Sequence, residues 1–169
     1  MLFRSGFVGL LVHEAYTDTA VIPTKNDRPT VGFGSTVRED GTPVQMGDRT
    51  TPVRAAQRSL AHVAKDEAGL KRCVKAPLHQ VEYDLLVNHA YQFGVASTCA
   101  SSMVKLVNEG RYREACDAYL LYRRSGGRDC SLPENARGPQ GCGGVWARSQ
   151  ERHAECLAVQ GPVSLGVTG

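Results

Sequence analysis

The sequence lacks the short motifs that identify many nucleotide-dependent, metal-dependent and serine-dependent enzymes. It contains no P-loop and no G-x-S-x-G, and His13 with Glu14 is not part of an H-E-x-x-H zinc motif. The segment Gly32 to Gly34 lacks the third glycine of a dinucleotide-binding loop and is better interpreted as a strand. No two cysteines are spaced as C-x-x-C, which excludes the usual zinc-ribbon and thioredoxin signatures. We therefore expect neither a metal ion nor a cofactor.

The sequence also lacks an apolar run of about 20 residues, the length that spans a bilayer. The N-terminal stretch up to Val12 is apolar but shorter, and it has no A-x-A cleavage site. Two interpretations of residues 1–14 stay open. They form either a buried first helix or the end of a longer membrane-targeting segment.

Low-complexity runs and internal repeats are absent, which argues against a disordered tail protein and against a solenoid. A chain of 169 residues that is 41% hydrophobic and 22% charged fits one compact domain with a substantial core. The net charge is +3, and eight arginines lie from Arg111 to Arg152. They form either an ordinary solvated surface or a surface that attracts a polyanion, such as nucleic acid or an anionic cell wall.

The cysteines are even in number, which indicates disulfides and an oxidising compartment such as the periplasm. The alternative is a set of free buried thiols, because cysteine is also a good small core residue. The six stand at Cys73, Cys99, Cys116, Cys130, Cys142 and Cys156. The sequence does not decide how they pair. Our first hypothesis joins Cys130 to Cys142, which closes the Gly- and Pro-rich loop between them.

The first part of the chain predicts a short helix followed by a hairpin. Residues 6–15 favour the helix, and the pattern then changes to alternating and β-branched residues. Turn-forming residues at 24–29 separate Thr19–Pro23 from Thr30–Ser35, which predicts that these two runs pair. We assign residues 15–50 to a small β lobe.

The rest of the chain predicts helices. Thr50 or Thr51 caps a helix that has Pro52 in its first turn and weakens at Gly69. Further helices are expected from Pro77 to Gly94, from about Ser101 to Asn108, from Tyr112 to near Gly126, and over 145–157, with a loop at 125–144. The predicted fold class is α+β, with the β-hairpin lobe joined to a larger all-helical lobe over 51–160, a cleft between the lobes, and a flexible tail over 161–169.

Glu14 is the first candidate for chemistry. It follows a strongly apolar run, so its carboxyl can sit at the base of the cleft, where desolvation raises its pKa. A carboxyl that stays protonated near neutral pH is what a general acid needs. Taken alone, a glutamate at a helix end is also typical of an ordinary surface residue.

The stretch from His13 to Gly34 combines Glu14 with a T-x-G-x-G strand that begins at Thr30. It resembles the catalytic signature of phage-type lysozymes, glycoside hydrolase family 24. Further segments are similar to that family in the same order, namely Met46–Asp48, Pro77–Val87, Tyr91–Gly94, Leu106–Tyr112 and Trp146–Leu157. The likeness covers about residues 10–157. It implies that residues 1–169 form a single lysozyme-like domain.

In such enzymes a glutamate ends the first helix, an aspartate (cysteine in some members) lies on the hairpin, and a threonine opens the T-x-G-x-G strand. The resemblance therefore implies Glu14 as the general acid and Thr30 as a second site residue. The family spacing places Thr24, which cannot act as a base, at the aspartate position. An inverting glycosidase needs a second carboxylate roughly 6.5 to 9.5 Å from the acid to activate water. We expect Thr30 with either Thr24 or Asp27 to hold the nucleophilic water, and Asp27 as an ordinary turn residue stays an alternative.

The resemblance also implies residues that contact the sugar. Tyr91 and Gln92 match positions that line the cleft in the family, where an aromatic face and an amide suit N-acetyl sugars. Gly32, on the T-x-G-x-G strand, is the third expected substrate-binding residue. Core packing of Tyr91 and a solvated amide for Gln92 are the alternative interpretations.

The function implied is that of a monomeric phage endolysin that works in the host periplasm and lyses the host cell. As a muramidase it would hydrolyse the β-1,4 bond between N-acetylmuramic acid and N-acetylglucosamine of peptidoglycan. Its expected partner is peptidoglycan, not nucleic acid. Two alternatives remain: a lytic transglycosylase that breaks the same bond with one glutamate, and a catalytically inert domain that binds the wall or nucleic acid through its arginines.

The apolar N-terminus also resembles the signal-arrest-release subgroup of endolysins, which is held inactive at the inner membrane until that segment escapes. No cysteine precedes Cys73 in this sequence. A thiol within the N-terminal segment therefore cannot be the switch. We expect activation to require refolding of residues 1–14 around Glu14.

Overall fold

The computed structural model describes residues 7, 11, 15–23, 27–138 and 141–161 of the chain. Strand β1 (Thr17–Val21) pairs antiparallel with β2 (Thr30–Gly32), with Thr17 opposite Gly32 and Val21 opposite Thr30. The predicted hairpin is confirmed, although β1 begins and ends two residues earlier than expected and β2 ends at Gly32 instead of Ser35.

The β lobe has a small apolar centre and a polar clamp. Its buried apolar cluster contains only Ala20, Val31 and Val44. The Arg38 guanidinium donates through Nε and NH2 to the two carboxylate oxygens of Asp48, at 2.7 and 2.8 Å. The Asp48 carbonyl in turn accepts from the Ala20 amide at 2.8 Å. The clamp therefore ties the loop before the first long helix to strand β1.

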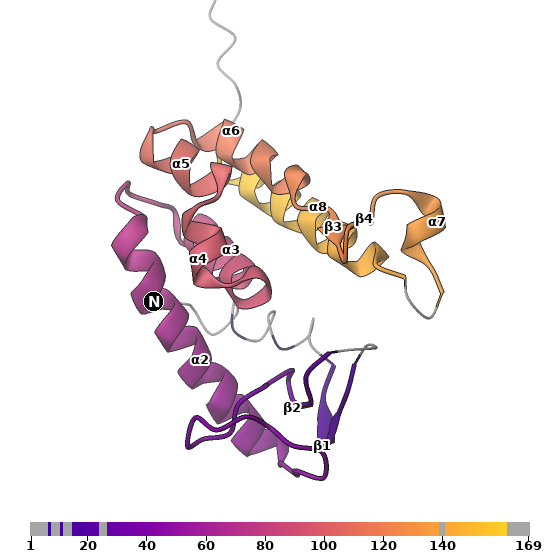
Figure 1. Cartoon of the computed structure of the whole chain (residues 1–169). Coiled ribbons are helices and arrows are strands. Elements are labelled where there is room, and N and C mark those ends of the chain that lie inside the picture. Colours follow the sequence, from indigo (N-terminus) through magenta and orange to yellow (C-terminus); the bar gives the residue numbers. More distant parts are fainter. Residues whose placement is uncertain (1–6, 8–10, 12–14, 24–26, 139–140, 162–169) are drawn as a thin grey trace, which may run out of the picture.

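Helix α2 (Pro52–Cys73) joins the β lobe to the helical lobe (Figure 1). Thr51 caps it as predicted, and its side chain accepts from the Arg54 amide at 3.4 Å. The predicted weakening at Gly69 is wrong, because the helix continues to Cys73. An added Cβ at Gly69 would lie 2.6 Å from Val95 Cγ1, so the glycine permits close packing.

The helical lobe contains most of the helices that the sequence predicted, together with short ones that it did not. Helix α3 (Gln80–Phe93) ends at Gly94 as expected, and Ser101 caps α5 (Ser102–Asn108). The short helix α4 (Val95–Cys99) between them was not foreseen. The prediction that one helix runs from Tyr112 to near Gly126 is wrong, because α6 (Tyr112–Asp117) passes into the 3₁₀-helix η1 (Ala118–Leu121) and stops there.

The segment that the sequence assigned to a loop over 125–144 carries structure of its own. Strands β3 (Arg124–Ser125) and β4 (Arg128–Asp129) pair around Gly126 and Gly127, which both have positive φ. A short helix α7 (Pro133–Ala136) follows. The last helix, α8 (Gly143–Ala158), contains the predicted 145–157 stretch.

The main core lies between α2, α3, α5, α6 and α8. Its largest members include Leu70, Leu86 and Met103, all almost fully buried. Phe7 and Leu11, both helical residues near the N-terminus, also pack against this core. Among the described residues, no helix has the length and apolar character needed to cross a membrane.

All six cysteines are in disulfides, so the expectation of disulfides is confirmed. The predicted Cys130–Cys142 bond is present and closes the loop around α7. The other two bonds join distant helices, namely Cys73–Cys99 from α2 to α4 and Cys116–Cys156 from α6 to α8.

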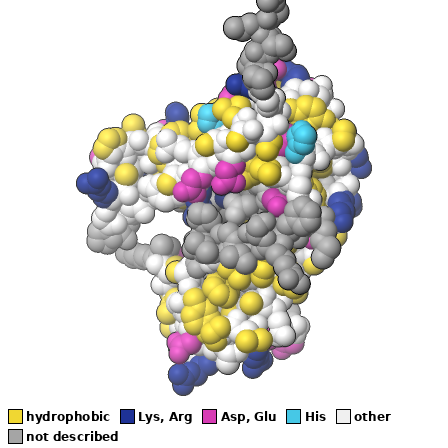
Figure 2. All heavy atoms as spheres, turned by 180° about the vertical axis from the view of Figure 1, so that it is seen from behind, with side chains coloured by type: hydrophobic (Ala, Val, Ile, Leu, Met, Phe, Trp, Pro, Cys, Tyr) yellow, Lys and Arg dark blue, Asp and Glu magenta, His cyan; other side chains and the backbone are white. Residues whose placement is uncertain are grey.

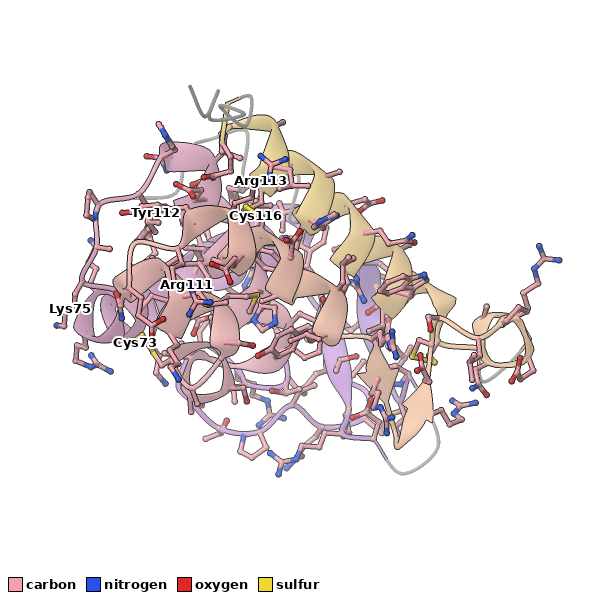
Figure 3. The ribbon with its side chains drawn as sticks, turned by 90° about the horizontal axis from the view of Figure 1, so that it is seen from above. Cys73, Lys75, Arg111, Tyr112, Arg113 and Cys116 are labelled. Atoms are coloured by element: carbon pink, nitrogen blue, oxygen red, sulfur yellow. A yellow bond between two sulfur atoms is a disulfide. The ribbon has the colours of Figure 1, made fainter. Side chains whose placement is uncertain are left out.

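The end of α2 is fixed to the corner between α5 and α6 (Figure 3). The Asn108 side chain accepts from the Lys75 amide at 2.8 Å and donates to the Cys73 carbonyl at 2.8 Å. The Tyr112 hydroxyl donates to the Pro77 carbonyl at 2.9 Å. Hydrogen bonds and a disulfide thus hold the far end of the connecting helix.

Candidate functional site

The site begins where the end of α3 meets the β lobe. The Tyr91 hydroxyl donates to the Phe33 carbonyl at 3.0 Å and lies 3.4 Å from Ser59 Oγ on α2. The Tyr91 ring also packs on the His62 ring, with centroids 5.1 Å apart. Tyr91 is therefore more than a core residue, because it links segments 58 residues apart across the two lobes.

Gly32 lies where β2 passes α2 most closely. Its φ is +70°, and an added Cβ would be 2.7 Å from the Cβ of Ala55. A side chain would meet both backbone strain and a steric clash, so only glycine fits without rearrangement. This close approach brings the start of the T-x-G-x-G strand against the connecting helix.

Thr30 and Asp27 lie at the end of the hairpin where the chain passes from β1 to β2. Thr30 is half-buried and opens β2, and its hydroxyl is 3.5 Å from the Val21 carbonyl, at the limit of a hydrogen bond. Asp27 is exposed, and one of its carboxylate oxygens accepts from the Arg28 amide at 2.8 Å. That contact is typical of a turn aspartate.

Glu14 and Thr24 lie outside the described residues. The described neighbours of Glu14 along the chain have clear positions. Leu11 packs on the helical core, and the Tyr16 ring lies 5.3 Å from the Phe33 ring. Phe33 is thus contacted on its ring by Tyr16 and on its backbone carbonyl by the hydroxyl of Tyr91.

Gln92 is held by an arginine that the sequence did not single out. Arg152, on α8, is only 3% exposed. Its Nε donates to Asn88 Oδ1 and its NH2 to Gln92 Oε1, each at 2.7 Å. The guanidinium also lies 6.0 Å from the centre of the Phe93 ring. The amide of Gln92 is therefore an organised group rather than a solvated one.

A sequence signal for Arg152 existed. Ser149, Arg152 and Cys156 are the buried residues of α8, and their spacing of three and four places them on one helical face. A charged residue on the buried face of a helix must have buried partners, which is a reason to examine it.

The same region contains a neutral histidine. Burial lowers the pKa of His89 to about 3, and the nearby charge of Arg152 acts in the same direction. The Thr98 hydroxyl donates to the Gly94 carbonyl, so its oxygen accepts a hydrogen bond from His89 Nδ1–H at 2.9 Å. His89 therefore has a structural role and is uncharged at neutral pH.

The described residues combine an aromatic side chain, an oriented amide and a half-buried hydroxyl at the junction of two lobes. Such a set suits a carbohydrate, since it offers a ring face and hydrogen bonds without fixed charge. Within residues 15–23, 27–138 and 141–161, no group of three or more His, Cys, Asp and Glu side chains is placed to hold a metal ion.

Comparison with known proteins gives consistent matches. Residues 8–137 match the family model described as phage lysozyme. The endolysin of Salmonella phage P22 is 29% identical over 125 residues, which cover 73% of this chain and 82% of that protein. The SAR-endolysin of Escherichia phage N15 is 30% identical over 122 residues, which cover 71% of this chain and 67% of that one.

A solved structure agrees with the fold. The endolysin from Escherichia coli O157:H7 phage FAHEc1 superposes with a TM-score of 0.78 at 26% identity, and the match covers 96% of each chain. The predicted α+β, lysozyme-like fold class is confirmed.

Proposed function

This chain belongs to the phage lysozyme family, and from this premise we propose that Glu14 is the general acid of its active site. The protein is a phage endolysin of the lysozyme type, a muramidase that hydrolyses bacterial peptidoglycan. Its substrate bond joins N-acetylmuramic acid to N-acetylglucosamine. Which residues perform the reaction is the subject of the proposal.

One observation carries the proposed site: the contact between Tyr91 and Phe33. It brings the strand that starts at Thr30 and the end of α3 to one place. Tyr16, whose ring packs on Phe33, is two residues after Glu14, so the two Cα atoms are at most about 7 Å apart. This short separation along the chain supports a site that combines the acid, the strand and the sugar-contacting residues.

In the proposed mechanism, the Glu14 carboxyl donates its proton to the glycosidic oxygen as the bond breaks. The apolar run before it favours the protonated form, because a desolvated carboxylate is costly. Thr30, together with Thr24 or Asp27, holds the water that attacks the sugar carbon from the other face. A threonine hydroxyl cannot remove the proton of that water, so with Thr24 and Thr30 alone the proton would pass to bulk water, whereas the Asp27 carboxylate can accept it directly.

The sugar chain is bound by Tyr91 and Gln92, and Gly32 contributes by letting β2 pack closely on α2. The Tyr91 ring offers an apolar face to a sugar ring, while its hydroxyl is occupied by Phe33. No metal ion or cofactor takes part in these steps.

The mechanism can be tested on purified peptidoglycan by mass spectrometry of the fragments. We expect the wild type to release fragments with hydrolysed muramic acid ends, and Glu14→Gln to release none while remaining folded. Anhydro-muramyl ends, which are lighter by one water, would instead identify a lytic transglycosylase and overturn the water-holding role of Thr30.

A pair of variants decides which group holds the water. If Asp27 is the base, Asp27→Asn should lower the rate by roughly a hundredfold or more. If Thr24 places the water with Thr30, then Thr24→Val should cause the larger loss and Asp27→Asn little. Comparable, small effects of both would contradict both versions of the proposal.

We further propose that the protein acts as a monomer in the host periplasm, tethered by its N-terminal segment before release. Relatives from phages N15 and phiKMV carry the name SAR-endolysin, which supports this location. Fractionation of cells that express the full chain tests it. Recovery in the membrane fraction before lysis is expected, and recovery only in the cytosol would contradict it.

A further inference from the structure

We propose that a pocket between the β lobe and the start of α2 binds a phosphate group, and that the Glu39 carboxylate competes with this ligand for two arginines. The site goes beyond the proposed function, because its ligand is a small anion and its test needs no peptidoglycan. We call it the arginine pocket. It has a volume of about 190 Å³ and is lined by Arg38, Arg49, Arg54 and Arg58, together with Glu39 and Asp48.

The first observation is the charge of the arginine pocket. Four arginines face two carboxylates, which leaves an excess of two positive charges. Arg38 is engaged by both oxygens of Asp48, whereas Arg49 is exposed and pairs only loosely with the exposed Asp18, at 3.9 Å. A phosphate group carries between one and two negative charges at neutral pH, roughly −1.5 to −2. It therefore matches the excess better than a single carboxylate does.

The second observation is the position of two of these arginines on α2. Arg54 lies in the first turn and Arg58 follows one turn later, and the first turn contains no acidic residue. The N-terminus of a helix carries a partial positive charge, so acidic side chains stabilise it and arginines there are unfavourable. An anion bound beside Arg54 and Arg58 would offset the charge of the helix end and of both side chains.

The third observation, and the strongest, is Arg58. Its side chain is only 10% exposed, and its Nη2 donates to Glu39 Oε1 at 2.8 Å. Its Nε and Nη1 are buried and have no hydrogen-bond partner among the described residues. A buried donor without an acceptor costs free energy, and the cost is higher for a charged group. Because Arg58 lines the pocket, an anion with several oxygens would supply these acceptors after a small side-chain rotation.

Glu39 is the group that an incoming anion would replace. Its Oε1 accepts from Arg58 at 2.8 Å and from Arg54 Nη2 at 3.3 Å. The hydrogen bond from Arg58 is the main cause of a lowered pKa of Glu39, so this carboxyl is ionised at neutral pH. The Glu39 side chain is half exposed, and ion pairs in such a position contribute little to stability. A ligand with more charge and more oxygens can therefore displace it.

The position of the arginine pocket gives its ligand a structural effect. Two of its arginines come from the β lobe and two from α2, and guanidinium groups bind phosphate oxygens in a two-pronged geometry. A bound phosphate would thus link the β lobe to the connecting helix. Val31, which also lines the pocket, directly follows Thr30. Because the ligand binds only the folded protein, it should raise Tm.

The probe is inorganic phosphate, titrated into the full chain and followed by NMR, with chloride at matched ionic strength as the background. We expect saturable binding by the wild type and a Tm that rises with phosphate concentration. Arg58→Met should weaken the binding by roughly tenfold or more, because it removes a charged two-pronged donor. Arg113→Met, at an exposed position on α6, is the control and should bind like the wild type.

A second pair of variants should shift the affinity in the opposite direction. Glu39→Gln removes the competing charge but keeps the shape of the side chain, so phosphate should bind roughly two- to fivefold more tightly. Glu155→Gln makes the same change at an exposed position on α8 and should leave the affinity unchanged. If Arg58→Met does not fold, Arg54→Gln tests the same site, because its side chain is 61% exposed, and it should also weaken binding.

Two sources share this chemistry, free phosphate and a phospholipid headgroup. Vesicles of phosphatidylglycerol, compared with vesicles of phosphatidylcholine, separate them. Binding to phosphatidylglycerol that falls in Arg58→Met identifies a headgroup as the ligand, and vesicle binding equal in that variant and the wild type identifies a soluble phosphate.

Three results would overturn the proposal. The first is a wild type without saturable binding of inorganic phosphate. The second is an affinity for phosphate that neither Arg58→Met nor Arg54→Gln lowers. The third is a Glu39→Gln variant that binds phosphate no more tightly than Glu155→Gln does.

Discussion

The two lobes are stabilised in different ways. In the helical lobe, twelve buried residues form one core. All three disulfides also lie in this lobe. In the β lobe, three small buried residues form the apolar centre. The rest of its stability comes from the clamp between Arg38 and Asp48 and from the packing of Gly32 on α2.

The surface shows the same difference. Apolar side chains gather at the β-lobe end of the back face (Figure 2). A hairpin of this size cannot bury its apolar residues within itself. The exposed large apolar side chains of residues 15–50 are Tyr16, Val21, Ile22, Val37 and Met46. The lobe that carries the proposed catalytic strand thus depends on its attachment to α2 and α3.

The largest effect on stability is expected in the helical lobe. Replacing both Cys116 and Cys156 by alanine opens a cross-link of separation 40 in its core and should cost about 4 kcal/mol. The same change at Cys130 and Cys142, of separation 12, should cost about 3 kcal/mol. Urea unfolding measures both. A larger loss of stability on removing Cys130–Cys142 would contradict the view that the core of the helical lobe contributes most to stability.

A smaller effect is expected at the contact between the lobes. Gly32→Ala places a methyl group in a backbone of positive φ and against Ala55, and should cost roughly 2 to 3 kcal/mol. Gly41→Ala, also at positive φ but with no atom within 4 Å of the added Cβ, should cost roughly 1 kcal/mol from strain alone. Equal losses of stability for the two variants, measured by thermal unfolding, would mean that the close packing of β2 on α2 does not contribute to stability.

Tyr91→Phe tests the link across the lobes directly. It removes the hydroxyl that donates to the Phe33 carbonyl and contacts Ser59 Oγ, and should cost about 1 to 2 kcal/mol. Tyr112→Phe removes a similar bond to Pro77 within the helical lobe and should cost no more than that. Only Tyr91→Phe should also lower the rate of peptidoglycan hydrolysis. Equal rates for the two variants would contradict a role of the Tyr91 hydroxyl in the site.

The smallest expected effect is on how the stability of the β lobe depends on pH in the acid range. The hydrogen bonds from Arg38 lower the pKa of Asp48 from its ordinary 3.8 to about 2. A lowered pKa in the folded state means that the stabilisation is present above pH 4 and is lost as the pH falls toward 2. Asp48→Asn should therefore flatten the dependence of stability on pH in this range. Asp18→Asn, at an exposed pair 3.9 Å from Arg49, is the control, and an identical profile for both would contradict the clamp.

The sequence predicted the elements whose signals are local. The hairpin, the Thr51 cap, the helix end at Gly94 and the Cys130–Cys142 bond all follow from residues close together in the chain. The β3–β4 hairpin was missed, because Gly126 and Gly127 form a turn between strands of two residues each, too short to give a pattern.

What the sequence did not predict depends on packing between distant segments. Gly69 was interpreted as a weak point because its close neighbour Val95 is 26 residues away. The roles of Arg152 and Tyr91 depend on partners 60 and 58 residues away. The resemblance to phage lysozymes pointed to Tyr91 and Gln92 as site residues, but only the three-dimensional contacts show how they are held.

The most direct test of the whole account is the initial rate of peptidoglycan hydrolysis by wild type and Glu14→Gln, measured across pH with equal amounts of folded protein. The account predicts that the wild-type rate falls as rising pH removes the acid proton, and that the variant is slower by roughly a hundredfold to ten-thousandfold in the pH range where the wild-type acid is protonated. A variant that keeps a tenth or more of the wild-type rate would show that another group supplies the proton.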